Sequence, residues 1–199
     1  MSLLRSPKRL ALVALIAFSA VVSSPTIADA TKADKQYQKP IKMLIGAIRY
    51  SKDDLALKML SIDKMSAEVN KDHWAKMTPA QRKEFSKGLG TLIRKLSFPK
   101  ARDIFKHLDA VLYGKAEVKG ALATIKTTIV IHRAYKKKEL VITWTLAKAK
   151  KKSWKILDTK TVGESTLKGI REAQTNPLVK EGGVELLMKT LRQKLASVK

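Results

Sequence analysis

The spacing of the apolar residues changes twice along the chain, and this change limits the possible folds more than any other feature. Across residues 111–157, hydrophobic and β-branched residues recur at every second position, which is the period of strands with one buried face. On both sides of this segment they recur every three or four positions, as in amphipathic helices. The sequence therefore predicts an α+β fold, in which N-terminal helices pack on a curved antiparallel sheet of about four strands and C-terminal helices follow.

One predicted helix has a well-defined start. Thr78-Pro79-Ala80-Gln81 combines a capping hydroxyl, a proline at the first helical position and a glutamine at the third. Gly88 and Gly90 inside this helix each cost about 1 kcal/mol relative to alanine, which suggests close packing against a neighbour. One face of the helix is therefore expected to be buried, and it carries Phe85, Leu89, Leu92, Ile93 and Leu96.

Helical segments also begin and end the predicted domain. Residues 37–60 predict two or three short helices, and residues 184–195 predict a last helix behind Gly182 and Gly183 that packs back onto the domain. Helices that cover one face of a curved sheet can enclose an apolar cavity. We therefore expect a ligand cavity built from the same apolar faces as the core.

The first thirty residues have the pattern of an export signal. Three basic residues precede an apolar run over residues 10–22, and Ala28-Asp29-Ala30 follows as a small-residue cleavage site. A run of this length is shorter than the ~20 residues that a membrane-spanning helix needs. The sequence thus predicts a signal peptide over residues 1–30, cleaved after Ala30, and a single domain over residues 31–199.

The charge balance of the chain is strongly basic, with 41 Lys and Arg against 17 Asp and Glu and a net charge of +24. Removal of residues 1–30, which hold three basic residues and Asp29, leaves +22. Such a surface attracts polyanions, and export makes nucleic acid the weakest candidate among them. Lysine clusters at 136–138 and 150–152 are predicted at hairpin tips, either as solvated loop charge or as a membrane or partner contact.

Cysteine is absent, so neither a disulfide nor a thiolate site can contribute. His73, His107 and His132 are far apart in sequence and lack metal-ligand spacing, so no metal site is expected. Ser165 follows Gly163 but lacks the second glycine of a nucleophile elbow, and it is better interpreted as a helix-start residue. Asp158 could face a cavity as a base, but a hydrogen-bonded structural role at a strand end is the stronger interpretation.

Four stretches of the chain carry recognisable motifs: His73 to Arg82, Thr127 to Ile131, Trp154-Lys155-Ile156-Leu157-Asp158, and Gly182-Gly183-Val184 with Leu187 and Leu191. In their order and spacing they resemble the MlaC (toluene-tolerance) family. The first is similar to that family's Trp, Thr-Pro-x-Gln-Arg and aromatic pattern, and the third to its Trp-basic-aliphatic-x-Asp strand. Together the four stretches extend over most of the chain after residue 30.

The resemblance implies a cone-like lipid-binding fold, related in shape to cystatin-like or NTF2-like domains, and a non-enzymatic role. It implies a periplasmic carrier of phospholipid without a cofactor, whose partners are an inner-membrane ABC transporter with an MCE-domain subunit and an outer-membrane lipoprotein complex. Nucleic acid is not expected as a partner. The predicted lipid-contacting residues are Phe85, Leu89, Leu92, Ile93, Leu96, Ile129, Ile131, Ile142, Trp144, Trp154 and Ile156, and the same residues could equally form an ordinary core.

Three other functions fit the sequence. A basic envelope protein could bind anionic lipid or glycan by its surface and hold nothing inside. A carrier with the same apolar cavity could take a hopanoid or sterol instead of a phospholipid. A small isomerase or hydrolase could use Asp158. Lipid that stays with the protein through purification would separate the carriers from the other two.

Overall fold

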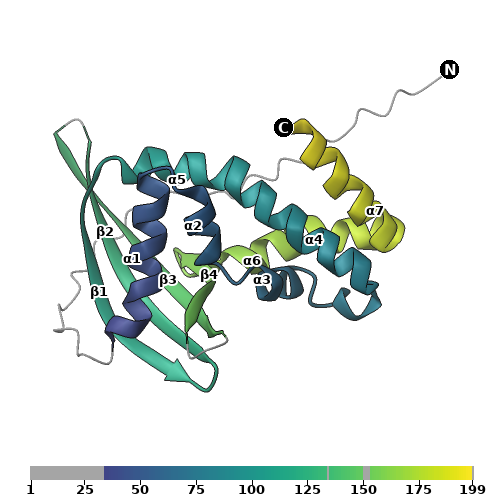
Figure 1. The fold of residues 1–199 in the computed structure, drawn as a ribbon, viewed down its shortest axis with the longest axis horizontal. Coiled ribbons are helices and arrows are strands. Elements are labelled where there is room, and N and C mark those ends of the chain that lie inside the picture. The colour runs from purple at the N-terminus through teal and green to yellow at the C-terminus, as the bar shows by residue number, and fades with distance from the viewer. Residues whose placement is uncertain (1–33, 134, 150–152, 199) are drawn as a thin grey trace.

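The computed structural model describes residues 34–133, 135–149 and 153–198, and Figure 1 shows a sheet on one side and a group of helices on the other. The predicted signal peptide and the lysine cluster at 150–152 lie outside the described residues. The predicted α+β order is confirmed. The helices are α1 (Lys35–Arg49), α2 (Asp53–Lys58), α3 (Ile62–Val69), α4 (Pro79–Leu92), α5 (Phe98–Phe105), α6 (Thr166–Ile170) and α7 (Asn176–Ser197), and the strands are β1 (Leu108–Lys119), β2 (Leu122–Arg133), β3 (Lys136–Lys148), β4 (Trp154–Thr161) and β5 (Glu164–Ser165).

The sheet is an antiparallel meander in the order β1-β2-β3-β4-β5. Its four long strands are those that the two-residue period predicts, and β5 adds a two-residue strand next to β4. Ile125 pairs with Trp144 across β2 and β3, and Trp144 pairs with Thr159 across β3 and β4. Register shifts in β1 and β4 bend the sheet, because an extra residue on one strand increases its local twist.

Helix α1 crosses one face of the sheet (Figure 1) and fills it with apolar side chains. Ile41 of α1 and Ile125 and Ile129 of β2 are essentially inaccessible to solvent. The indole of Trp144, buried in the same cluster, donates a hydrogen bond to Thr127 Oγ1 at 2.8 Å, which satisfies its polar atom inside the core. This half of the molecule is a packed core.

A second apolar cluster joins α3, α4, α6 and α7 to the edge of the sheet at Leu157. Helix α4 begins as the sequence predicts, because Thr78 and Gln81 exchange both hydrogen bonds of a capping box. The close packing predicted at Gly88 is also present: a Cβ there would lie 3.0 Å from Leu191 Cδ2 of α7. Helices α4 and α7 thus approach each other closely at Gly88, whereas Gly90 faces Ile62 of α3 at ordinary contact distance.

Helix α7 is broken near its middle. Gly182 has φ −151° and ψ 25°, and Gly183 has φ 68° and ψ −171°, a combination that glycine adopts almost alone. A Cβ at Gly182 would lie 2.8 Å from Leu186 Cβ. The break allows residues 184–197 to turn back along α4. Within the described part of the chain, none of the helices is long and apolar enough to cross a membrane.

Candidate functional site

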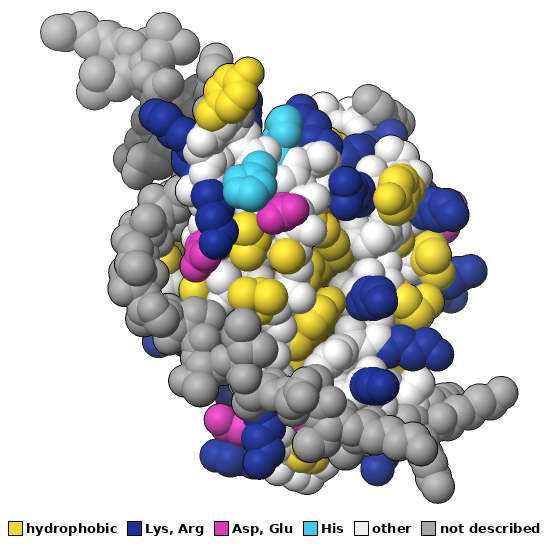
Figure 2. All heavy atoms as spheres, turned by 90° about the vertical axis from the view of Figure 1, so that its left-hand side faces the viewer, with side chains coloured by type: hydrophobic (Ala, Val, Ile, Leu, Met, Phe, Trp, Pro, Cys, Tyr) yellow, Lys and Arg dark blue, Asp and Glu magenta, His cyan; other side chains and the backbone are white. Residues whose placement is uncertain are grey.

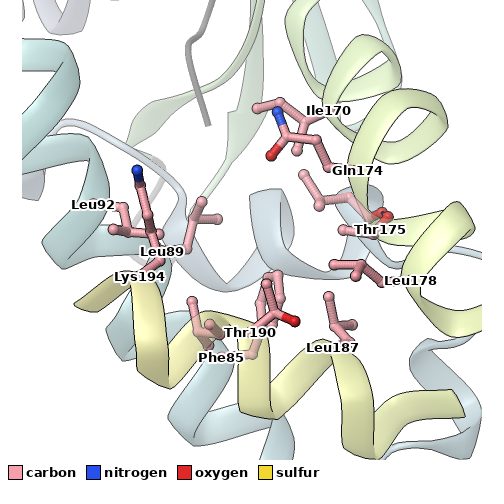
Figure 3. Close-up of a pocket in the computed structure, with 12 residues that line it drawn as sticks. Phe85, Leu89, Leu92, Ile170, Gln174, Thr175, Leu178, Leu187, Thr190 and Lys194 are labelled. Carbon is pink, nitrogen blue, oxygen red and sulfur yellow. Dashed lines mark hydrogen bonds between the residues drawn. The ribbon is translucent and has the colours of Figure 1, made fainter. Parts of the chain in front are cut away.

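A cavity of about 70 Å³ lies between α4 and the second half of α7, and α6 and the π-helical turn after it form the opposite wall (Figure 3). Its surface is almost entirely apolar. The residues that line it are Val69, Phe85, Leu89, Leu92, Ile170, Gln174, Thr175, Leu178, Leu187, Thr190, Leu191 and Lys194.

Three helical stripes with nearly the same spacing build this cavity. The first runs along α4, the second from α6 into the start of α7, and the third along the end of α7. Residues three, four or eight positions apart lie on one face of a helix, so each stripe points its side chains the same way. The stripes are Phe85, Leu89 and Leu92; Ile170, Gln174 and Leu178; and Leu187, Leu191 and Lys194.

The polar groups at the cavity differ in whether they have hydrogen-bond partners. Thr175 Oγ1 donates to the carbonyl oxygen of Val69 at 2.8 Å. The side-chain oxygen of Gln174, by contrast, is buried and has no hydrogen-bond partner among the described residues. An unsatisfied buried acceptor costs about 1 to 3 kcal/mol, so a donor supplied by a ligand or by water would bind there favourably. Half-buried Lys194 adds a cation to the lining (Figure 3).

Two polar contacts hold the second half of α7 against α4. Arg192 makes a bidentate ion pair with Glu84, at 2.7 Å from Nε to Oε1 and 2.9 Å from Nη2 to Oε2. Gln81 Nε2 donates to Glu185 Oε1 at 2.7 Å. The hydrogen bond from Arg192 lowers the pKa of Glu84, so the carboxylate stays ionised well into the acidic range. We call the Arg192–Glu84 and Gln81–Glu185 pairs the α7 clamp.

The predicted lipid-contacting residues fall into two places. Phe85, Leu89 and Leu92 line the cavity, and Ile93 and Leu96 follow in the next turns, partly buried. The strand residues lie on the other side, in the core under α1, and Trp154 packs edge-on against Tyr37 with ring centroids 5.0 Å apart. Contact of these strand residues with a ligand stays a prediction; they are Ile129, Ile131, Ile142, Trp144 and Ile156.

Sequence reasoning missed the wall formed by residues 170–178. Ile170, Gln174 and Leu178 do repeat at helical spacing, but a glutamine in the middle of the stripe weakens the apolar signal. That polar residue between two apolar ones could have marked the wall as a binding surface.

The residues considered for catalysis have structural roles. Asp158 accepts hydrogen bonds from Ser165 Oγ at 2.5 Å and from the Leu167 amide at 3.1 Å, which fixes the start of α6. Ser165 in turn accepts from the Lys168 amide, so its predicted place at a helix start is confirmed. Asp158 does not line the cavity. No group of three or more His, Asp or Glu side chains that could hold a metal forms within the ranges that the structure describes.

Fold and site together define a class of protein: a small α+β domain with an apolar cavity between helices beside a packed sheet. The family model described as MlaC protein matches residues 27–193, so the chain belongs to the MlaC family, as the sequence motifs indicated. No curated protein matches the chain.

A solved structure shares this fold. The phospholipid-binding protein from Ralstonia solanacearum, solved in complex with a phospholipid, is 13% identical and superposes with a TM-score of 0.67. The match covers 84% of this chain and 99% of that protein. At this identity the likeness concerns the fold alone, and it includes both the sheet and the helical half.

Proposed function

We propose that this protein is a periplasmic carrier that binds phospholipid acyl chains between α4 and α7 and moves the lipid between membrane complexes. The observation that carries the proposal is the apolar cavity lined by three helical stripes, in a chain of the MlaC family. The phospholipid named for the R. solanacearum protein, which has the same fold, supports the choice of ligand.

The energetics of the ligand explain why such a cavity is needed. At ~0.8 kcal/mol per methylene removed from water, a single long acyl chain costs on the order of 10 kcal/mol to bring into solution. A carrier must replace the lost bilayer contact with apolar side chains, and Phe85, Leu89 and Leu187 supply them. In this proposal Lys194 pairs with the lipid phosphate, and the unpaired Gln174 oxygen accepts a hydrogen bond from a hydroxyl or ammonium group of the lipid.

The cavity must widen to take a whole acyl chain. Its volume of about 70 Å³ is well below the ~300 to 1,000 Å³ of typical ligand pockets. The side that can move is α7, because Gly182 and Gly183 interrupt its helix. Its second half is held by the buried side chains of Leu187, Met188 and Leu191 and by the α7 clamp. We therefore infer that residues 184–197 swing away from α4 to admit lipid.

Export and partners belong to the same proposal. The basic residues, apolar run and Ala28-Asp29-Ala30 site support a signal peptide cleaved after Ala30, and the family match beginning at residue 27 is consistent with a domain that starts nearby. As family partners we propose an inner-membrane ABC transporter with an MCE-domain subunit and an outer-membrane lipoprotein complex. We propose no catalytic step and no cofactor.

Native mass spectrometry of the mature protein purified from cells tests the carrier role. The expected result is protein plus the mass of one or more phospholipids, identified after extraction. A Lys194→Gln variant should retain less phospholipid, whereas Lys189→Gln, which removes an exposed lysine from the same helix, should match the parent. Protein at its bare mass that also takes up no phospholipid from vesicles would reject the proposal.

A further inference from the structure

The connection between β2 and β3 carries a tyrosine that the fold does not use. Arg133 pairs with Lys136, so two residues make the turn, and Tyr135 in this turn has φ 62° and a fully exposed side chain. Turns of this length favour glycine or asparagine, because a bulky residue at positive φ is strained. The backbone at Tyr135 is therefore strained, and its fully exposed aromatic ring adds nothing to packing. Its place at a protruding tip makes the ring available to a partner.

Basic side chains surround this ring. Lys137 is paired with Glu139, at 3.0 Å. Arg133, Lys136 and Lys138 have no carboxylate within ion-pair distance in the ranges that the structure describes. The tip therefore presents one aromatic ring among three cations that form no close ion pair within the described ranges, although the pKa of the Asp103 carboxyl is lowered first by its hydrogen bond from Lys106 and also by the charge of Arg133.

A basin of about 400 Å³ lies at the base of the same hairpin. Ile104 and Ile131 supply its apolar surface, and Arg133, Lys138 and His107 its basic and polar surface. The acid in its lining, Asp103, is ion-paired with Lys106 at 2.9 Å. Figure 2 views this side of the molecule, where basic side chains, histidines and a few acidic side chains surround an area of hydrophobic side chains.

We propose that the β2–β3 hairpin docks on the surface of an anionic phospholipid bilayer, with Tyr135 among the headgroups and one lipid phosphate in the basin between Arg133 and Lys138. An aromatic ring beside several basic residues is the composition that proteins place at the membrane interface. The apolar part of the basin suits the glycerol and first methylenes of the same lipid, and the cations suit its phosphate.

This docking goes beyond the carrier function and leaves the carrier cavity free. The hairpin lies at the far left of Figure 1, whereas α4 and α7, which form the cavity, lie in the helical half on the right. A protein docked by the hairpin would keep α7 away from the bilayer surface. The hairpin would concentrate the carrier at an anionic membrane, and the cavity would still be accessible to a protein partner.

Co-sedimentation with vesicles tests the proposal. The mature protein is mixed with vesicles of phosphatidylcholine alone or of phosphatidylcholine and phosphatidylglycerol, and should bind the second kind. Because a basic residue near an anionic surface changes the affinity about fivefold, Lys136→Gln with Lys138→Gln should weaken binding on the order of 25-fold. Tyr135→Ser should weaken it further. The matched control, Lys83→Gln with Lys87→Gln on exposed positions of α4, removes the same charge and should change binding by less than about threefold.

Equal losses in the two double variants would overturn the proposal, since attraction would then depend on overall charge. Binding that is unchanged in the hairpin double variant would overturn it as well. Lipid carried from cells is measured on the same samples and should be unaffected by the hairpin changes. A parent protein that carries no lipid would reject the carrier function, while the vesicle result would still decide the docking.

Discussion

Replacing Leu92 by phenylalanine tests whether the cavity between α4 and α7 holds the lipid. Leu92 is 4% exposed and its side chain borders a space of about 70 Å³, roughly the volume of two water molecules at ~30 Å³ each. A phenylalanine is larger than the leucine that it replaces, and the added atoms would occupy part of this space. Overpacking a solid core usually costs ~1 to 3 kcal/mol, but here the cavity accepts the added atoms. We therefore expect the free energy of unfolding of the lipid-free protein to change by less than ~1 kcal/mol.

Ile142→Phe is the matched control from the other half of the molecule. Ile142 is 8% exposed and lies in the packed core under α1, between Thr127 and Thr161 on the neighbouring strands. The same enlargement has no cavity to enter there, so we expect a loss of about 1 to 3 kcal/mol. In a domain of this size each 1 kcal/mol lowers the Tm by about 2 to 4 °C.

Two measurements on each variant separate the outcomes. Native mass spectrometry gives the lipid that co-purifies, and thermal unfolding is followed on delipidated samples, because bound lipid raises the Tm by mass action. Leu92→Phe should retain less lipid at a Tm close to that of the parent, and Ile142→Phe should keep its lipid at a lower Tm. If Leu92→Phe keeps its lipid while Ile142→Phe loses it, the lipid lies on the sheet side, among predicted lipid-contacting residues such as Ile142 and Trp144.

Three further changes probe the parts around the cavity. The hydrogen bond from Arg192 lowers the pKa of Glu84, so the stabilisation from this pair is present above the ordinary pKa of glutamate and is lost as the pH falls through the lowered value. The hydrogen-exchange protection of residues 184–197 should therefore fall at low pH. The Glu84→Gln variant should remove this pH dependence. Gly183→Ala should lower the free energy of unfolding by ~1 to 3 kcal/mol, because alanine is strained at the φ and ψ of this residue. If the midpoint of chemical denaturation is unchanged, the break in α7 tolerates a side chain. Asp158→Ala leaves the Leu167 amide and the Ser165 hydroxyl without their acceptor and should lower the free energy of unfolding by ~1 to 3 kcal/mol. Lipid retention should persist, and both effects are checked by thermal unfolding and native mass spectrometry.

Local chemistry made much of the fold predictable from the sequence. The start of α4 follows from Thr78 and Gln81 alone, because the capping box uses groups only three positions apart. The strands could be predicted equally well, because the alternation of Leu140, Ile142 and Trp144 with their neighbours directly reflects the two faces of a sheet. Both patterns depend only on residues close together in the chain, so they can be recognised without knowledge of the tertiary structure.

The position of the cavity could not be obtained this way. Phe85 in α4 and Ile129 in β2 are both predicted from the sequence as apolar residues on a buried face, yet the first borders a cavity and the second is sealed under α1. The difference depends on how well facing elements fill the space between them, which pattern alone does not encode.

The contacts that complete the cavity join parts of the chain that are far apart in sequence. Arg192 reaches Glu84 across 108 positions, whereas the strands of the meander pair with their immediate neighbours along the chain. Contacts between distant segments close a long loop before they stabilise anything, so they form late in folding. The strands of the sheet can therefore pair before the C-terminal helix arrives, and the proposed lipid site is completed only by residues 184–197. A protein threaded through a membrane from its N-terminus would thus have no finished lipid site until it had left the translocation channel.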